Sequence, residues 1–366
     1  MGFYDGLSGT STTASAWQVA DTLNLPVLLV VRPKGASLTL AAQIKGLQSF
    51  RTPSHLAGIL LNDCKPGLYK MLAPMLEAET GLPVAGFLPP VPEAAIGSRH
   101  LGLYTAGEVE DLQQKIALLA QAAEENIHWE KLLSLCEQPA PAAARIKQEH
   151  KKQCVKIAVA RDEAFCFAYA ETLDCLRTAG AELVFFSPVH DTTLPEDICG
   201  LYLPGGYPEL YARPLSENKT MRDAIRDAVN GGLPTVAECG GFLYLHTTLT
   251  DREGHSYPMA GVLPGKCFDT GHLVRFGYIE LEENSGYFMP RGSRIRAHEF
   301  HYYDSEDNGA DCIATKPSTG RNYPCIHVGE NHWYGFPHLY YPSCPEFAER
   351  FVENAKKFSK SGKDML

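Results

Sequence analysis

The stretch "PTVAECGGFLYL", residues 234–245, places a cysteine after a short apolar run and directly before two glycines. The run before the cysteine predicts a buried strand, and "FLYL" predicts the start of a helix. Cys239 would then occupy a strand–turn–helix elbow, where the turn is so tight that its neighbours must be small. Such an elbow projects its side chain above the carboxyl edge of a sheet. We therefore interpret Cys239 as a nucleophile; the alternative is an ordinary buried cysteine at a strand end.

The residues around this elbow supply further parts of a thiol reaction site. The helix N-terminus behind Cys239 favours thiolate over thiol. The backbone N–H of Gly240 is placed to bind an oxyanion, as in hydrolase elbows. In "LPGGYPE" (203–209), Gly205 and Gly206 follow another strand and can present N–H groups across the sheet from the elbow. A simple turn between strand and helix is the alternative interpretation of that glycine pair.

A thiol nucleophile also needs a base, and the chain has 13 histidines. His338, in "WYGFPHLYYPSCPEF", precedes the last predicted helix, where a loop could bring it over the sheet edge. His298 and His301, in "RAHEFHYYD", are the other candidates. Spacing alone does not choose among these three residues.

The rest of the chain predicts two α/β domains. Apolar runs at 25–31, 56–62 and 82–89 alternate with helical patterns, which is typical of a doubly wound parallel sheet. The stretch 138–153, "QPAPAAARIKQEHKKQ", has no apolar period and predicts an interdomain linker. A second α/β unit begins at "VKIAVARD" (155–162) and becomes richer in β-structure after about residue 257, before a closing helix. We therefore predict domains at 1–137 and 154–366.

Composition excludes several classes of protein. The chain has 366 residues and a net charge of −10 without a basic stripe, which argues against nucleic acid as a partner. No apolar run is long enough to span a membrane, and no signal peptide is visible, so a cytoplasmic location is expected. The 11 cysteines show neither zinc spacing nor a disulfide framework, which fits a reducing compartment.

Several segments together resemble one family, the cobyrinic acid a,c-diamide synthases. The second half resembles their class I glutamine amidotransferase domain in "VAECGGFLYL", "LYLPGGYPELYA", "AVARDEAF", "RAHEFHYYD" and "PHLYYPSCPEFAERF". The first half resembles their ATP-using synthetase domain in "MGFYDG", "LNLPVLLVV", "LAGILLN" and "SRHLGL". The resemblance runs in order through both domains, so it is more specific than any single motif.

The resemblance implies a fold and an activity. The fold would be an incomplete P-loop NTPase-like (dethiobiotin-synthetase-like) sheet followed by a flavodoxin-like glutamine amidotransferase domain. Cys239 would hydrolyse L-glutamine through a thioester, and His338 matches the catalytic histidine, ahead of His298 and His301. Ammonia would then amidate the a and c carboxylates of cobyrinic acid, or of a related tetrapyrrole, after activation by ATP and Mg²⁺. A homodimer is also implied.

The sequence departs from the family pattern in two places. Class I amidotransferases often place an acid two residues after the catalytic histidine, and here that residue is Tyr340. The family's P-loop is missing, and "GLSGTSTTAS" (6–15) has no lysine in register. We expect the sequence to be a fragment or to have a mispredicted start, because loss of the neighbouring strands would leave an exposed sheet edge. A split gene and a loss of ATP chemistry are the alternatives.

Further site residues follow from the resemblance alone. Asp5 would lie near metal and phosphate, although a turn aspartate before Gly6 is the alternative. Asn62 would contact the nucleotide base, although Asp63 stands where a basic residue often follows. Three more residues would meet substrate, with a turn cap or an ordinary exposed side chain as the alternative interpretation: Arg99, His100 and Arg275.

Four functions therefore compete. The first is a glutamine- and ATP-dependent ligase of cobalamin biosynthesis, and the second is a glutaminase subunit or fragment that needs a partner for synthesis. The third is a cysteine hydrolase of the DJ-1-like kind, which shares the elbow, and the fourth is a non-catalytic corrinoid-binding protein. Ammonia release from glutamine that depends on Cys239 separates the first two from the last two. ATP-dependent amidation separates the first from the second.

Overall fold

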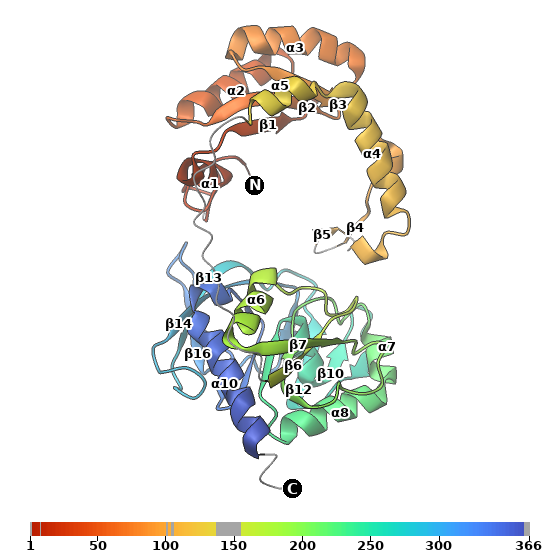
Figure 1. Cartoon of the computed structure of the whole chain (residues 1–366), viewed down its shortest axis with the longest axis vertical. Coiled ribbons are helices and arrows are strands. Elements are labelled where there is room, and N and C mark those ends of the chain that lie inside the picture. Colours follow the sequence, from red (N-terminus) through yellow and green to blue (C-terminus); the bar gives the residue numbers. More distant parts are fainter. Residues whose placement is uncertain (1, 8, 100–101, 104–105, 137–154, 362–366) are drawn as a thin grey trace. The chain divides into compact units, whose positions relative to one another are not determined.

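The computed structural model describes residues 2–7, 9–99, 102–103, 106–136 and 155–361. The chain divides into two compact units, Met1–Arg145 and Ile146–Leu366 (Figure 1). The predicted linker, 138–153, lies outside the described residues, so its bounds stay a prediction.

The first unit is built on a parallel sheet with strands in the order β1, β2, β3. These strands are β1 (Val27–Val31), β2 (Leu56–Asn62) and β3 (Val84–Leu88), which confirms the three predicted apolar runs. Helices α2 (Leu38–Phe50) and α3 (Pro66–Thr80) connect them. Parallel neighbours require such crossover connections, so the α/β prediction is confirmed for this unit.

Strand β1 forms an edge of this sheet within the described residues, because it pairs only with β2. In the central strand, Ile59 and Leu61 are completely buried, whereas Val30 of β1 is 54% exposed. An apolar edge of this kind offers unpaired backbone groups to another strand.

The remaining elements of this unit are short or peripheral. Helix α1 (Ala16–Leu23) was not predicted, although its N-cap signal is present: the Ser15 hydroxyl accepts the backbone N–H of Gln18 at 3.1 Å. The other elements are η1 (Pro92–Ala94), β4 (Ser98–Arg99), β5 (Gly102–Leu103), η2 (Ala106–Glu108), α4 (Leu112–Asn126) and α5 (Trp129–Ser134).

The second unit contains the sheet that positions the elbow, with strand order β18-β19-β9-β8-β6-β7. All neighbours are parallel except β18 and β19. Taken in chain order, the five parallel strands lie in the order 2-1-3-4-5, which is the flavodoxin-like arrangement and confirms that prediction. The strands are β6 (Val155–Ala160), β7 (Ala181–Phe186), β8 (Ile198–Leu203), β9 (Thr235–Glu238), β18 (His327–Gly329) and β19 (His332–Gly335).

Two smaller sheets make up the β-rich remainder that the sequence predicts. One has the order β11-β10-β12-β15, and the other has the order β17-β16-β13-β14-β20. In the second sheet, β20 pairs antiparallel with β14, so that His338 lies opposite His298. The strands are β10 (His246–Thr250), β11 (Ser256–Pro258), β12 (Leu263–Asp269), β13 (Arg275–Glu283), β14 (Arg294–His301), β15 (Tyr303–Ser305), β16 (Cys312–Thr315), β17 (Asn322–Cys325) and β20 (His338–Leu339).

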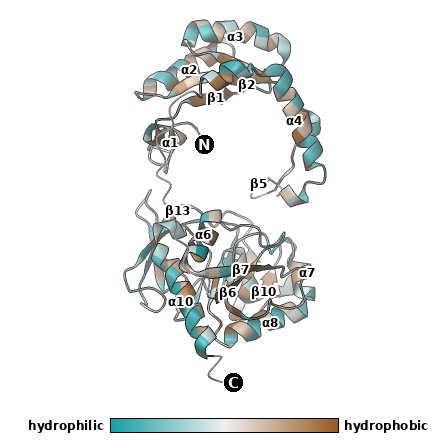
Figure 2. Ribbon diagram, viewed as in Figure 1, coloured by the Kyte–Doolittle hydropathy of each residue, from teal (hydrophilic) through white to brown (hydrophobic). Residues whose placement is uncertain are grey.

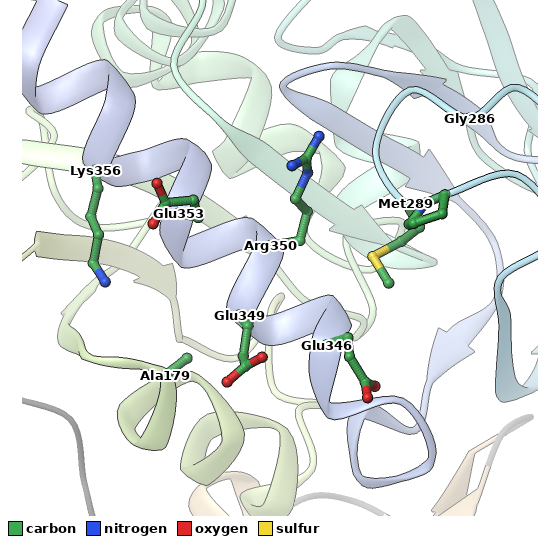
Figure 3. A pocket seen from close by; sticks show the side chains of 9 residues that line it. Ala179, Gly286, Met289, Glu346, Glu349, Arg350, Glu353 and Lys356 are labelled. Carbon is green, nitrogen blue, oxygen red and sulfur yellow. The ribbon is translucent and has the colours of Figure 1, made fainter.

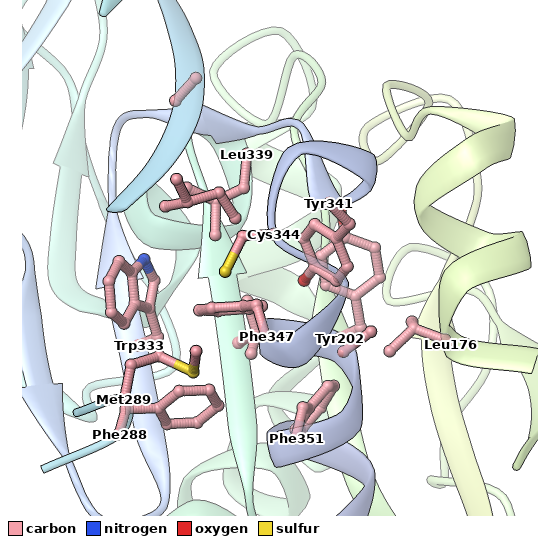
Figure 4. Close-up of a cluster of buried hydrophobic side chains, with 14 of the residues drawn as sticks. Leu176, Tyr202, Phe288, Met289, Trp333, Leu339, Tyr341, Cys344, Phe347 and Phe351 are labelled. Carbon is pink, nitrogen blue, oxygen red and sulfur yellow. The ribbon is translucent and has the colours of Figure 1, made fainter. Parts of the chain in front are cut away.

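Apolar clusters cover both faces of the flavodoxin-like sheet. On one face, α10 (Pro345–Ser361) buries Phe347 and Phe351 beside Tyr202 and Trp333 (Figure 4). Each such side chain contributes about 1.5–3 kcal/mol by leaving water. The helices on this sheet are amphipathic. In Figure 2, α8 (Lys219–Asn230) and α10 carry both hydrophilic (teal) and hydrophobic (brown) residues. The remaining helices are α6 (Ala170–Ala179), α7 (Ala212–Glu217), α9 (Gly240–Leu245) and η3 (Tyr341–Ser343).

Within the described ranges, no helix combines the length and apolar character needed to cross a bilayer.

Candidate active site

Cys239 occupies a strained elbow between β9 and α9. Its backbone has φ 47° and ψ −103°, a conformation that costs a non-glycine residue of the order of 1–3 kcal/mol. Only glycine fits at the two positions after Cys239, because a Cβ at either position would clash with neighbouring atoms. A Cβ at Gly240 would lie 2.8 Å from Cδ of Pro208, and a Cβ at Gly241 would overlap the carbonyl of Leu203. The predicted strand–turn–helix elbow with obligatory small neighbours is confirmed.

The sheet brings His338 to the same place. Strands β9 and β19 are parallel neighbours, and the N–H of Cys239 donates to the carbonyl oxygen of Gly335 at 2.8 Å. His338 follows Gly335 by three residues, so it lies just beyond the same edge as the cysteine. Its side chain is almost completely buried.

The glycine loop after β8 lies between the elbow and the histidine. A Cβ at Gly205 would overlap Cε1 of His338 and lie 3.0 Å from its Nδ1, so the loop backbone touches the imidazole. A Cβ at Gly240 would lie 3.0 Å from the backbone nitrogen of Gly206, so the elbow touches the same loop. Within the described residues, no backbone carbonyl accepts from the amides of Gly206 and Gly240. The Gly240 N–H also hydrogen-bonds to the Cys239 sulfur. The three predicted oxyanion-hole residues, Gly205, Gly206 and Gly240, lie together at this contact, and their role in binding an oxyanion stays a prediction.

Both reacting groups are neutral in the resting site. Burial raises the pKa of the Cys239 thiol well above its usual range, and the Glu209 and Glu299 carboxylates raise it further. Burial also lowers the pKa of His338 well below its usual range, and His298 and His301 lower it further. The Gly240 N–H at the start of α9 lowers this pKa, which is the direction predicted for the helix N-terminus, but desolvation has the larger effect. A thiol nucleophile needs a neutral base to take its proton when the sulfur attacks.

His301 and His298 occupy different surroundings. The His301 ring stacks on Phe336 with centroids 4.0 Å apart, and its Nδ1 lies 2.6 Å from the carbonyl oxygen of Tyr303. The His298 ring stacks on His338 with centroids 4.8 Å apart. Of the three candidate bases, His338 is therefore the one that lies against the glycine loop.

Arg275 lies in the amidotransferase-like unit and has a defined partner. Its guanidinium carbon is 3.7 Å from the ring centroid of Tyr323, whose hydroxyl donates to the buried carboxylate of Glu299. The alternative of an ordinary exposed arginine is therefore wrong.

The predicted site residues of the first unit are scattered. Asp5 is exposed and accepts the N–H of Gly2 at 2.7 Å, which is the turn arrangement given as its alternative. Asn62 ends β2 at the carboxyl edge of the sheet, and the adjacent Asp63 pairs with Arg32 at 3.2 Å. Arg99 lies in β4, and nothing of its side chain is described. His100 lies outside the described residues.

Comparison with known proteins places the chain in a family. Residues 156–326 match the model of the CobB/CobQ-like glutamine amidotransferase domain. The cobyrinate a,c-diamide synthase of Caldanaerobacter subterraneus subsp. tengcongensis is 37% identical over 366 residues, which cover 98% of this chain and 80% of that protein. The chain belongs to the cobyrinate a,c-diamide synthase family. The synthases of Dehalococcoides mccartyi (34% identical) and Salmonella typhimurium (35% identical) also match 98% of this chain and 80% of their own length.

The residues that match the family's amidotransferase model, 156–326, include the elbow and the glycine loop, and His338 lies after them in the chain.

The synthase family also implies ATP and Mg²⁺, so the first unit must be tested for a place to hold them. In the loop at 6–13, the amides of Gly6 and Leu7 donate to the carbonyls of Ser11 and Thr13 rather than facing a phosphate. The described residues of this unit also bring no three metal-ligating side chains together. The described residues of this unit therefore do not form a MgATP site by themselves.

Glu238 is a site residue that sequence reasoning missed. It directly precedes the nucleophile and is 2% exposed. One carboxyl oxygen, Oε2, accepts the Tyr202 hydroxyl at 3.2 Å, and the carboxyl also accepts the N–H of Leu339, next to His338. Burial raises the pKa of Glu238 to about 8, so the group is mainly protonated at neutral pH. It thus ties the strand that carries His338 to the sheet without placing a full charge beside the thiol.

This raised pKa predicts a pH-dependent difference between the Glu238→Gln variant and the parent protein. The folded value of about 8 lies above the unfolded value of 4.5, so the parent loses stability as pH rises through this window. The amide does not titrate. We expect the variant's free energy of unfolding, relative to the parent's, to increase by about 1.4 kcal/mol per pH unit between about pH 5 and 8. Urea unfolding at several pH values measures it, and a constant difference would contradict the buried-acid account.

A surface pocket of about 520 Å³ lies away from this site, along α10 (Figure 3). Its charged lining comes from successive turns of that helix: Glu346, Glu349, Arg350, Glu353 and Lys356. None of the predicted site residues lines it.

Proposed function

We propose that the chain hydrolyses glutamine at Cys239 and uses the ammonia to amidate the a and c carboxylates of cobyrinic acid. Membership of the cobyrinate a,c-diamide synthase family supports this reaction. The observation that carries it is the arrangement around Cys239. The cysteine has φ 47°, the elbow residue Gly240 touches the glycine loop after β8, and the buried His338 imidazole lies against that loop.

The geometry supports a double-displacement reaction. The Cys239 sulfur attacks the side-chain amide carbon of glutamine while His338 takes the thiol proton. The amides of Gly205, Gly206 and Gly240 are the proposed donors to the oxyanion of the tetrahedral intermediate. His338 returns the proton to the leaving nitrogen, so that ammonia departs and a thioester remains. Water, deprotonated by His338, then attacks the thioester, releasing glutamate and restoring the thiol.

Ammonia made inside a protein keeps its nucleophilic lone pair, whereas free ammonia is mostly protonated near neutral pH. A carboxylate accepts it only after activation, because hydroxide is a poor leaving group. ATP with Mg²⁺, which the synthase family implies, would supply that activation as an acyl phosphate. We propose Asn62 as a nucleotide contact, Asp5 as a neighbour of metal and phosphate, and Arg99, His100 and Arg275 as substrate contacts. The proposed compartment is the cytoplasm, and the proposed assembly is a homodimer.

A glutaminase that supplies ammonia to another protein is the second candidate function. One observation favours it: the amides of Gly6 and Leu7 hydrogen-bond to carbonyl oxygens of their own loop, so they do not point to a bound phosphate.

The experiment follows two products from the purified chain. With glutamine alone, release of glutamate and ammonia is expected, and its absence would contradict both candidates. With cobyrinic acid, ATP and Mg²⁺ added, mass spectrometry of the corrinoid is expected to show one and then two carboxylates converted to amides. Glutaminase activity without any amide product would favour the second candidate. Hydrolysis of esters or peptides while glutamine is left intact would support a plain cysteine hydrolase.

A further inference from the structure

Among the residues that the structure describes, no carboxylate hydrogen-bonds to the proposed catalytic histidine, His338. Tyr340 stands two residues after His338 and is 43% exposed. The Nδ1 atom of His338 is buried and has no hydrogen-bond partner among the described residues. In thiol and serine hydrolases, a carboxylate on that nitrogen fixes the orientation of the imidazole. Some other feature must hold this ring.

Aromatic rings enclose the His338 imidazole instead. His298 lies opposite it across the β14–β20 pair, and the two imidazoles stack with centroids 4.8 Å apart and planes 15° apart. The Phe167 ring meets His338 edge-on, with centroids 4.7 Å apart and planes 69° apart. The backbone of Gly205 also touches the imidazole. The ring therefore has little freedom to tilt or rotate.

The enclosing rings are themselves fixed. The Tyr169 hydroxyl lies 2.9 Å from Nδ1 of His298, which sets the plane of that ring. The N–H of Phe167 donates to the carbonyl of Gly205 at 3.0 Å, and its phenyl ring meets the Tyr169 ring edge-on with centroids 5.3 Å apart. Burial raises the pKa of Tyr169 to about 12, so its hydroxyl keeps its proton and the hydrogen bond persists across neutral pH.

We propose that His298, held by Tyr169, is the positioning residue for His338, and that ring stacking replaces the missing carboxylate. The inference rests on the proposed glutaminase function and adds a role that spacing in the sequence does not give. Stacked aromatic pairs contribute about 0.5–1.5 kcal/mol beyond their buried area.

Two other buried groups near the site do not take this role. Glu238 acts on the main chain of Leu339 and on Tyr202 rather than on the imidazole. The His301 ring stacks on Phe336, and its Nδ1 lies within hydrogen-bond distance of the carbonyl oxygen of Tyr303. His298 is the group whose ring lies parallel to His338.

The test compares His298→Ala with His298→Phe in the full chain. Alanine removes the stack, and we expect kcat for glutamine hydrolysis to fall about 10- to 100-fold with KM within about threefold, because positioning affects the chemical step. Phenylalanine restores a flat ring, and kcat is expected to return to within about fivefold of the parent value. Tyr169→Phe is expected to fall between the two. His255→Ala, on an exposed turn, is the matched control and is expected to leave kcat unchanged.

A second measurement does not depend on activity. Crystal structures of the parent and of His298→Ala are expected to show the His338 ring rotated or spread over several orientations in the variant only. An unchanged ring, or a kcat for His298→Ala within twofold of the parent, would overturn the proposal. Equal loss in the alanine and phenylalanine variants would also overturn it, because a ring nitrogen rather than stacking would then be required. A parent protein without glutaminase activity would instead refute the proposed function, and the ring orientation would still test His298.

Discussion

The Cys239→Ala variant is expected to lose glutamine hydrolysis by a factor of about 10³ or more, because no other group can form the thioester. The side chain is small and 9% exposed, so alanine removes the sulfur with little change in packing. Alanine meets the same backbone strain at φ 47° as cysteine does, and the fold is expected to survive. Initial rates of glutamate release, with thermal melting as the check on folding, measure the effect.

Cys199→Ser is the matched control, because Cys199 lies in the same unit, is only partly buried and bonds to the carbonyl of Asp197. It is expected to keep full glutaminase activity. If Cys239→Ala kept a tenth or more of the parent rate while the control behaved as expected, the nucleophile would have to lie elsewhere.

The Gly205→Ala variant is expected to have the second-largest effect, a fall in kcat of about 10²-fold or more. The new methyl group would occupy the space of Cε1 of His338. Either the loop backbone or the imidazole must therefore move away from its present position. General acid–base catalysis by a positioned histidine contributes about 10²–10⁴-fold, so displacing the ring removes most of that factor. Steady-state kinetics with glutamine, accompanied by circular dichroism, measure it.

Gly46→Ala serves as the control for a glycine-to-alanine change. A Cβ at Gly46 meets no atom within 4 Å, and the residue lies inside α2. The change is expected to raise stability by up to about 1 kcal/mol and to leave glutaminase activity unchanged. A Gly205→Ala protein as active as the parent would show that His338 does not work from its position against this loop.

The elbow could be predicted from the sequence because its determinants are local. A buried strand, a cysteine and two glycines leave few backbone paths, and the structure confirms both the turn and the need for small neighbours. The apolar runs of the first unit predicted its parallel strands for the same reason. Helix α1 could also have been found, since Ser15 and Gln18 form a local capping signal.

The choice among the histidines could not be made from spacing. His338 reaches the elbow because β19 pairs with β9, and His298 reaches His338 because β20 pairs with β14. Both pairings join segments that are far apart in the chain. The resemblance to the synthase family ranked His338 first, and the contact with Gly205 agrees with that ranking.

The effect of burial on the thiol pKa was not predicted for a similar reason. The sequence shows the helix that follows Cys239, but burial depends on how distant segments cover the sulfur. Glu209 and Glu299 come from two such segments, and their carboxylates raise the thiol pKa. The role of Glu238 was missed because its partners, Tyr202 and Leu339, lie on other strands.

The most direct test of the account is to locate the adduct of a diazoketone analogue of glutamine on the protein. The thiol of a glutaminase displaces nitrogen from such an analogue and keeps it as a stable thioether. Peptide mass spectrometry is predicted to place a single adduct on Cys239 among the 11 cysteines, to show its loss in the presence of excess glutamine, and to show much slower labelling in His338→Ala. Labelling of another cysteine in preference to Cys239, or labelling at Cys239 that glutamine does not prevent, would contradict the assignment of the glutamine site to the elbow.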